Sequence, residues 1–393
     1  MAPFCSMSVG WVRLGCLEPC AIVSPPRPLA VRLGLRLLLV VGGLVVGLGL
    51  AEGLARVFGP PLPGFVLDAT LTVYEPRLYA RHPTRITTLA PNADVTLQAI
   101  EYTSRVRTDR LGLRGAPPAD GNARIAFVGD SFTLGVQVDE TDTFAERVAH
   151  RLAEDGGTRV VALNAGVDGY GTLQATDRLG ELLQQTRLTH AVLTVYLGND
   201  LRDDTRLERK RQAMNGPPPD ESGFDSLDTM QRKSAVARWS RLYAWVQVVR
   251  ALRAQASDFR IQEYADELAV FVDPAARASQ LQATRRGLAE FGSVCRWRRL
   301  KCTVALAPPA WVVHPERAEA TFSAFGLDAA DADAAAVVSA VRGSVPAGLT
   351  VVDLTAPLQA AGADRALHFT FDPHWNAAGH AVVAEALVKE GAW

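Results

Sequence analysis

The chain has 393 residues, of which 48% are apolar and 21% are charged. This length and composition exclude a disordered chain and allow one large buried core, with room for a second small one. With 41 basic and 42 acidic residues the net charge is −1, so no global positive field favours nucleic acid, and we expect no nucleic-acid partner.

The N-terminal region predicts a membrane-targeting element. Residues 37–51 are an uninterrupted apolar run, which adjacent leucines extend toward the roughly 20 residues that a bilayer requires. Arginines precede the run at positions 13, 27, 32 and 36, and basic residues keep their side of a span in the cytoplasm. We therefore expect a cytoplasmic tail over 1–30, a transmembrane signal-anchor over 31–57, and an extracytoplasmic remainder.

Two alternatives to an anchor stay open. The tripeptide that ends at Ala51 is typical of a small-x-small cleavage site, so a cleaved signal peptide would release the remainder as a secreted protein. A buried hairpin helix is the other alternative, although the charge asymmetry disfavours it. In an exported domain, Cys295 and Cys302 are either a disulfide or two buried thiols, and spacing alone does not decide between them.

The next segment, 58–122, contains proline-rich turns and short alternating runs such as "DVTLQAIEY". Alternation with period two is typical of half-buried strands. We expect a β-rich extension between the membrane segment and the main domain.

From Arg124 onward the pattern alternates between apolar strands and amphipathic helices. The predicted strands are "RIAFVG", "RVVALN", "HAVLTVYLG", "CTVALAPP" and "LTVVDL". Apolar strands separated by helices indicate a parallel sheet covered on both faces. We predict a flavodoxin-like three-layer α/β/α domain over 123–393, with a five-stranded, mainly parallel sheet. The pattern lapses over about 203–289, which predicts a helical insertion beside the site.

Polar residues follow the predicted strands, where the carboxyl ends of a doubly wound sheet gather ligands. They come from four short sequences: "GDS" at 129–131, "NAGVDGYGT" at 164–172, "GND" at 198–200 and "DPHWN" at 372–376. A serine becomes a nucleophile when a neutral histidine removes its proton and a carboxylate orients that histidine. Ser131, His374 and Asp372 fit these three roles.

The oxyanion of an acyl-transfer intermediate also needs hydrogen-bond donors. The candidates are the backbone N–H groups of Ser131 and Gly169 and the side-chain amide of Asn199. We expect Asp130 to hold the nucleophile turn and His380 to be a packed histidine. The spacing of histidines and carboxylates predicts no metal, and the glycines near 169 match no nucleotide motif, so we expect no cofactor.

The four short sequences, in this order and spacing, resemble the sequence blocks of the SGNH hydrolases, also called the GDSL esterase/lipase superfamily. The resemblance covers about 124–390, and it implies a Ser131–His374–Asp372 triad with an oxyanion hole of Ser131, Gly169 and Asn199. Many members separate the last Asp and His by two residues, whereas here one residue lies between them and Trp375 follows. This variant resembles a membrane-tethered bacterial branch of polysaccharide O-acetyltransferases and esterases.

Three functions remain open. The first is an exported serine esterase that removes acyl groups from a carbohydrate or lipid. The second is an O-acetyltransferase that acts on exported polysaccharide or cell-wall glycan. A membrane protein would then donate the acyl groups to this enzyme. The third is a glycan-binding module without catalysis, which the intact Ser131, Asp372 and His374 disfavour.

Overall fold

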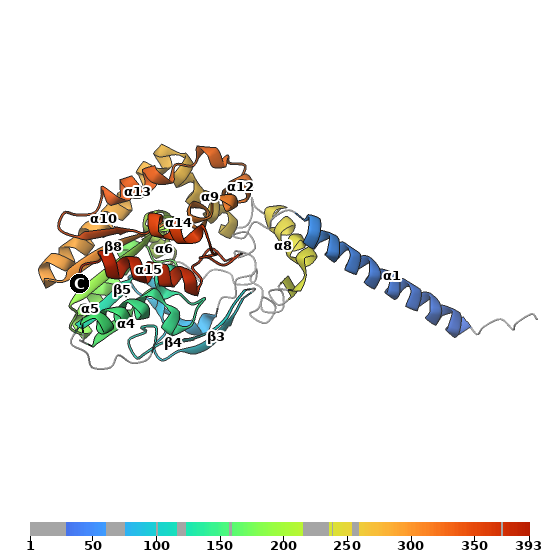
Figure 1. Ribbon diagram of the computed structural model, residues 1–393, viewed down its shortest axis with the longest axis horizontal. Helices are drawn as coiled ribbons and strands as arrows, with labels where there is room; N and C mark the ends of the chain where they lie inside the picture. The colour runs from blue at the N-terminus through green and yellow to red at the C-terminus, as the bar shows by residue number, and fades with distance from the viewer. Residues whose placement is uncertain are drawn as a thin grey trace, which may run out of the picture. The chain divides into compact units, whose positions relative to one another are not determined.

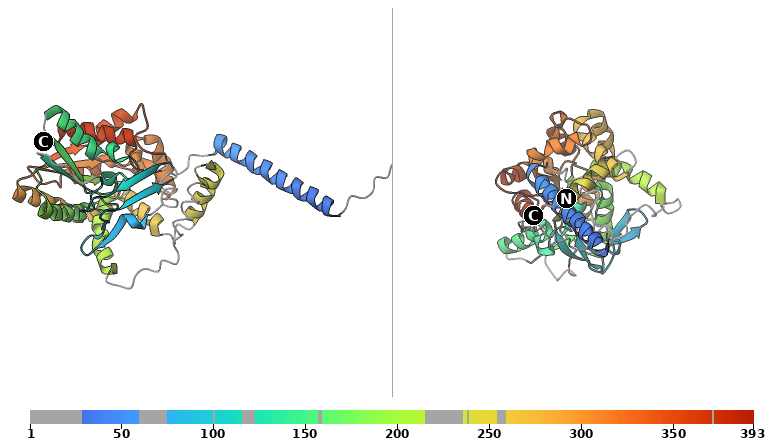
Figure 2. Two further views of the ribbon diagram at one scale, coloured as in Figure 1. Left: turned by 90° about the horizontal axis from the view of Figure 1, so that it is seen from below. Right: turned by 90° about the vertical axis from the view of Figure 1, so that its right-hand side faces the viewer.

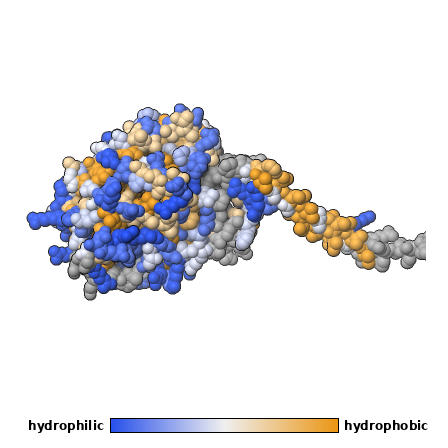
Figure 3. Space-filling view, viewed as in Figure 1, coloured by the Kyte–Doolittle hydropathy of each residue, from blue (hydrophilic) through white to orange (hydrophobic). Residues whose placement is uncertain are grey.

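The computed structural model describes residues 29–59, 75–99, 101–115, 123–156, 159–214, 236–237, 239–253, 259–370 and 372–393. The chain divides into two units, Met1–Leu54 and Ala55–Trp393. Helix α1 (Leu29–Phe58) is the described part of the first unit and continues into the second. Within it, Leu33–Phe58 contains an 18-residue window with a mean hydropathy of 2.3 and is long and apolar enough to cross a membrane, as an anchor or as a signal sequence. The face of this helix that is visible in Figure 3 is predominantly hydrophobic.

The second unit is built on one parallel sheet (Figure 1). Its strands are β5 (Ala123–Val128), β6 (Val160–Asn164), β7 (His190–Tyr196), β8 (Lys301–Ala307) and β9 (Thr350–Asp353). They lie in the order β6-β5-β7-β8-β9, and all four pairings are parallel. This is the flavodoxin-like order, so the predicted fold class is confirmed.

Alternate side chains of each strand enter two separate cores, because successive residues of a strand point to opposite faces. Ala126 and Val128 of β5 pack in a core with helices α5, α10 and α13, whereas Ile125 and Phe127 pack in a core with α4, α14 and α15. The bounds of these helices are α4 Phe144–Gly156, α5 Thr172–Gln185, α10 Pro274–Arg298, α13 Ala334–Arg342, α14 Thr355–Gly362 and α15 Ala377–Glu390. The sheet therefore forms the middle of three layers (Figure 2).

The expected β-rich region contains two antiparallel hairpins, β1 (Tyr79–His82) with β2 (Ile86–Leu89) and β3 (Asp94–Gln98) with β4 (Thr103–Arg107). Their apolar side chains share a core with Leu134 and Val136, which lie between β5 and α4, and with Val167 and Tyr170, which lie between β6 and α5. The hairpins thus pack against the edge of the sheet where the polar residues gather.

Helices lie between β7 and β8, as expected for the insertion. They are α6 (Asp200–Met214), α8 (Arg241–Arg253), α9 (Phe259–Val272) and α10. The expected boundary near 289 falls inside α10, which starts at Pro274 with Asp273 as its N-cap and packs on α5 as a layer helix. The predicted end of the insertion thus coincides with no helix end, because α10 continues its buried face across residue 289.

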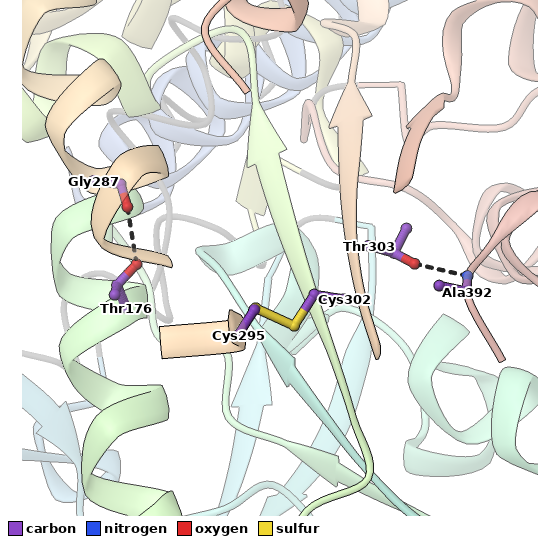
Figure 4. The surroundings of a disulfide bond; sticks show 6 residues. All are labelled: Thr176, Gly287, Cys295, Cys302, Thr303 and Ala392. Atoms are coloured by element: carbon purple, nitrogen blue, oxygen red, sulfur yellow. Dashed lines mark hydrogen bonds between the residues drawn. A yellow bond between two sulfur atoms is a disulfide. The ribbon is translucent and has the colours of Figure 1, made fainter. Parts of the chain in front are cut away.

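Short helices complete the domain: α3 (Ser131–Leu134), α11 (Ala310–Val313), α12 (Ala318–Ser323), and the 3-10 segments Pro76–Leu78, Glu140–Asp142, Pro315–Arg317 and Ala329–Asp331. Cys295 in α10 and Cys302 in β8 form a disulfide, which decides the alternative that the sequence left open (Figure 4). Both sulfur-bearing residues are buried.

Candidate active site

The predicted nucleophile lies at the end of β5, where the chain turns sharply into α3. Gly129 has φ of 154°, and a Cβ there would lie 2.4 Å from Thr133 Oγ1 and 2.9 Å from the Thr194 carbonyl oxygen. Only glycine fits this turn without displacing its neighbours. Asp130 caps α3, because its Oδ1 accepts a hydrogen bond of 3.0 Å from the Phe132 N–H. Ser131 is thereby presented at the first position of α3.

The other two predicted triad residues approach Ser131 from the loop before α15. His374 Nε2 lies 2.7 Å from Ser131 Oγ, and His374 Nδ1 lies 2.6 Å from Asp372 Oδ1. The same Asp372 oxygen accepts a 2.8 Å hydrogen bond from the His374 backbone N–H. One imidazole thus bridges a hydroxyl and a carboxylate that lie 241 positions apart in the chain (372 − 131).

The Phe132 ring packs against this histidine and is itself held by other aromatic rings. It lies 4.6 Å from the His374 ring, 4.0 Å from the Tyr196 ring in a stacked arrangement, and 4.8 Å from the Trp375 ring edge-on. Trp375 is fully buried. Phe132 therefore restricts the rotation of the imidazole from one side.

The two further oxyanion candidates lie at the same edge of the sheet. Asn199 ends the β7 turn and lines the same cavity as Ser131, and its Oδ1 is buried without a hydrogen-bond partner in the described part of the chain. Gly169 lies in the loop after β6 with φ of 68°, and it does not line that cavity within the described ranges. The adjacent Asp168 interacts electrostatically with His374 and Asp372, so the loop after β6 that carries Gly169 lies near the histidine.

Buried carboxyl groups surround the site. Burial raises the pKa of Asp130 to about 7, although the charge of His374 lowers it in part. Burial also raises the pKa of Asp200 well above its ordinary value, and the nearby Asp130 adds to this shift. Asp200 accepts a 3.0 Å hydrogen bond from the Tyr196 N–H, so it holds the turn that carries Asn199. Asp130 and Asp200 organise backbone turns here, as expected for Asp130.

A cavity of ≈ 520 Å³ opens in front of Ser131. Its wall includes aromatic and charged side chains from the insertion and from the segment after β8, namely Arg241, Tyr264, Glu267, Phe271, Trp311, Glu316, Arg317 and Phe325. The sequence pattern predicts an insertion beside the site, but no motif marks these residues. The volume falls within the range of sites for small organic ligands.

The remaining predicted residues fit a structural role. His380 is buried, and its Nδ1 accepts a 3.2 Å hydrogen bond from the Phe144 N–H. Burial lowers the pKa of His380 to about 3, so it is neutral at physiological pH. Over the described ranges, no group of three or more His, Cys, Asp or Glu side chains has the arrangement of a metal site.

Comparison with known proteins gives one match to a family model. Residues 127–382 match the GDSL-like lipase/acylhydrolase family. A search of curated proteins gives no match.

Solved structures give distant matches. TesA is 13% identical, with 68% of this chain and 97% of TesA covered and a TM-score of 0.34. A variant of Axe2, an acetyl xylan esterase from Geobacillus stearothermophilus, is 13% identical, with 68% and 94% covered and a TM-score of 0.36. EstA, a psychrotrophic esterase from Pseudoalteromonas sp., is 11% identical, with 68% and 96% covered and a TM-score of 0.33. The assignment to a family therefore rests on the family model.

Proposed function

Because the chain belongs to the GDSL-like lipase/acylhydrolase family and is a hydrolase of ester bonds, we propose that it is an exported serine esterase with Ser131 as its nucleophile. The observation that carries this proposal is the hydrogen-bonded series from Ser131 Oγ through both ring nitrogens of His374 to Asp372 Oδ1. A serine, a histidine and a carboxylate in this order are the groups that nucleophilic acyl transfer requires.

The proposed reaction has two halves. Ser131 Oγ attacks the ester carbonyl while His374 Nε2 takes the hydroxyl proton, and Asp372 stabilises the imidazolium that forms. The intermediate collapses to an acyl-Ser131 ester, and His374 returns the proton to the departing alkoxide. Water then attacks the acyl group, His374 takes its proton, and release of the carboxylic acid regenerates the Ser131 hydroxyl.

We assign the oxyanion donors to the backbone N–H groups of Ser131 and Gly169 and to the side-chain amide of Asn199. Asn199 is supported by its position on the wall of the cavity that Ser131 also lines. Loss of one such donor typically raises the barrier by roughly 3 kcal/mol.

The proposed substrate is an O-acyl group on a carbohydrate or lipid. Trp311, Tyr264 and Phe325 offer apolar faces in the cavity, and Arg241 and Glu316 line it with charge. A site with both properties suits an ester whose alcohol part carries hydroxyl groups. We further propose that the domain is extracytoplasmic, which the disulfide and the helix α1 support, because disulfides persist in oxidising compartments.

Ser131→Ala tests this function in the full chain purified in detergent. We expect the wild type to hydrolyse p-nitrophenyl acetate and to form an acyl-Ser131 adduct detectable by mass spectrometry, and the variant to lose both. Addition of oligosaccharides distinguishes the transferase alternative, because transfer would yield acetylated sugar in place of free acetate. Retained hydrolysis by the variant would reject Ser131 as the nucleophile.

A further inference from the structure

The turn of the β3–β4 hairpin reaches the loop that carries Asp372. Ala99 N–H donates a 3.0 Å hydrogen bond to the Tyr102 carbonyl and closes this turn, which contains Glu101. Glu101 Oε1 accepts a 2.7 Å hydrogen bond from the Thr370 N–H, and Glu101 Oε2 accepts a 3.0 Å hydrogen bond from the Asp372 N–H. Both oxygens of one carboxylate therefore bind the backbone of a loop about 270 residues away in the sequence.

Neighbouring contacts hold the same loop from two further sides. The Tyr102 ring lies 5.5 Å from the Phe369 ring, and Arg317 Nη1 donates a 2.8 Å hydrogen bond to the Phe369 carbonyl. Arg317 also interacts electrostatically with Glu101. Phe369, Thr370 and Asp372 are thus held by groups outside this loop, although none of the three belongs to a helix or strand.

We propose that Glu101 is a positioning residue for the reaction: its carboxylate holds the Asp372 backbone so that the Asp372 side chain meets His374 Nδ1. This inference rests on the proposed function, since it gives Glu101 its effect through Asp372. Under this proposal, the β3–β4 hairpin contributes a residue that positions the catalytic triad.

The hydrogen bonds between Asp372 and His374 depend on the position of the Asp372 backbone, which Glu101 holds. Asp372 Oδ1 accepts two hydrogen bonds from His374, of 2.8 Å from the backbone and 2.6 Å at the ring, so a small shift of the Asp372 backbone changes both. Asp372 is only 6% exposed, and solvent would replace Glu101 poorly. The hairpins contact a second loop of the site as well, because the Tyr79 hydroxyl donates a hydrogen bond to Asp168 beside Gly169.

Two substitutions separate positioning from charge. Glu101→Gln and Glu101→Ala remove the same negative charge, but glutamine keeps one oxygen that can accept a backbone N–H. Asp94→Asn is the matched control, because Asp94 lies in the same hairpin and forms an exposed ion pair with Arg105. Over the described ranges, the titratable groups that interact with His374 include Asp130, Asp168, Asp372, His368 and His380, and the variants leave these unchanged.

The measurements are kcat and KM for p-nitrophenyl acetate as a function of pH, with the full chain in detergent. We expect Glu101→Ala to lower kcat by roughly 10- to 100-fold with little change in KM, as expected for a misplaced catalytic group. Glu101→Gln should lose less, and Asp94→Asn should match the wild type. In Glu101→Ala the acid limb of kcat/KM should move to lower pH, because the His374 imidazolium loses part of its stabilisation by Asp372.

A second measurement does not depend on turnover. In protein labelled with ¹⁵N-histidine, the His374 Nδ1–H should give a downfield proton signal in the wild type and Asp94→Asn, and a weakened or shifted signal in Glu101→Ala. Unchanged kcat, pH limb and signal in Glu101→Ala would overturn the inference, and so would equal kcat losses in the two Glu101 variants. If the wild type is inactive but Glu101→Ala still changes the His374 signal, the proposed function is overturned. The role of Glu101 in placing Asp372 against His374 is then still supported.

Discussion

At the scale of single residues, the site depends on positions whose roles come from distant parts of the chain. Gly129 and Asp130 shape the turn that carries Ser131. Their roles can be predicted from the local sequence, because a tight turn needs glycine and a short helix needs a cap. Glu101 has no such local signal. Its role comes from a hairpin that folds onto a loop near the C-terminus, and a lone glutamate in a turn does not indicate that contact.

Glu146, in the first turn of α4, provides a prediction about pH. Burial raises the pKa of Glu146 from 4.5 to about 7, the charge of Glu140 adds to the shift, and Arg114 opposes it. A carboxyl with a raised pKa in the folded state binds its proton more tightly there than in the unfolded chain, so stability is lost as pH rises through the folded pKa. We expect the free energy of unfolding to fall between about pH 4.5 and 7, and the fall to be smaller in Glu146→Gln.

Urea unfolding of both proteins at several pH values measures this difference. The buried histidines, whose lowered pKa values act in the opposite direction at acid pH, are the same in both proteins and cancel from the comparison. Glu154→Gln, an exposed position on α4, serves as the control. If Glu146→Gln follows the wild-type pH dependence, the carboxyl of Glu146 is ionised in the folded protein and the prediction is wrong.

At the scale of elements, the strands were largely predictable. The five apolar runs became β5 to β9. Local rules suffice for these features because each depends on residues close in sequence. The end of the insertion was not predictable, since α10 has no break at residue 289. The aromatic cavity wall was not predictable either, because it requires the packing of separate helices.

We predict that the disulfide in the connection between α10 and β8 stabilises the folded protein. Cys295 and Cys302 close a short loop there, and both are buried (Figure 4). A disulfide over a loop of this length contributes about 2–3 kcal/mol in the chain-entropy description. We expect the double variant Cys295→Ala/Cys302→Ala to have a free energy of unfolding about 2–3 kcal/mol lower than that of the wild type.

Urea unfolding with and without reductant separates the bond from the packing of the two side chains. Reductant should destabilise the wild type and have no effect on the double variant. A wild type insensitive to reductant, with free thiols found by alkylation of the unfolded chain, would contradict the disulfide.

At the scale of the whole molecule, an apolar helix precedes a domain that carries a disulfide and an esterase-type site. Arginines lie on the N-terminal side of the helix, and basic residues favour the cytoplasmic side. The disulfide favours an oxidising compartment for the domain. These two observations are independent, since one concerns arginines before and within the first turns of the helix, and the other concerns residues more than 200 positions after its end.

They lead to the same prediction for the full chain in bacterial cells. Protease added to intact spheroplasts should degrade the domain, and Cys295 and Cys302 should resist alkylation until they are reduced. An anchor predicts a full-length protein that stays in the membrane after a carbonate wash, and Ala51→Arg should change nothing. A cleaved signal predicts a shorter, released product that begins after Ala51, and Ala51→Arg should block its formation, because cleavage requires a small residue there. Protection of the domain from protease in spheroplasts, with degradation after lysis, would place the site in the cytoplasm and reject export under either alternative.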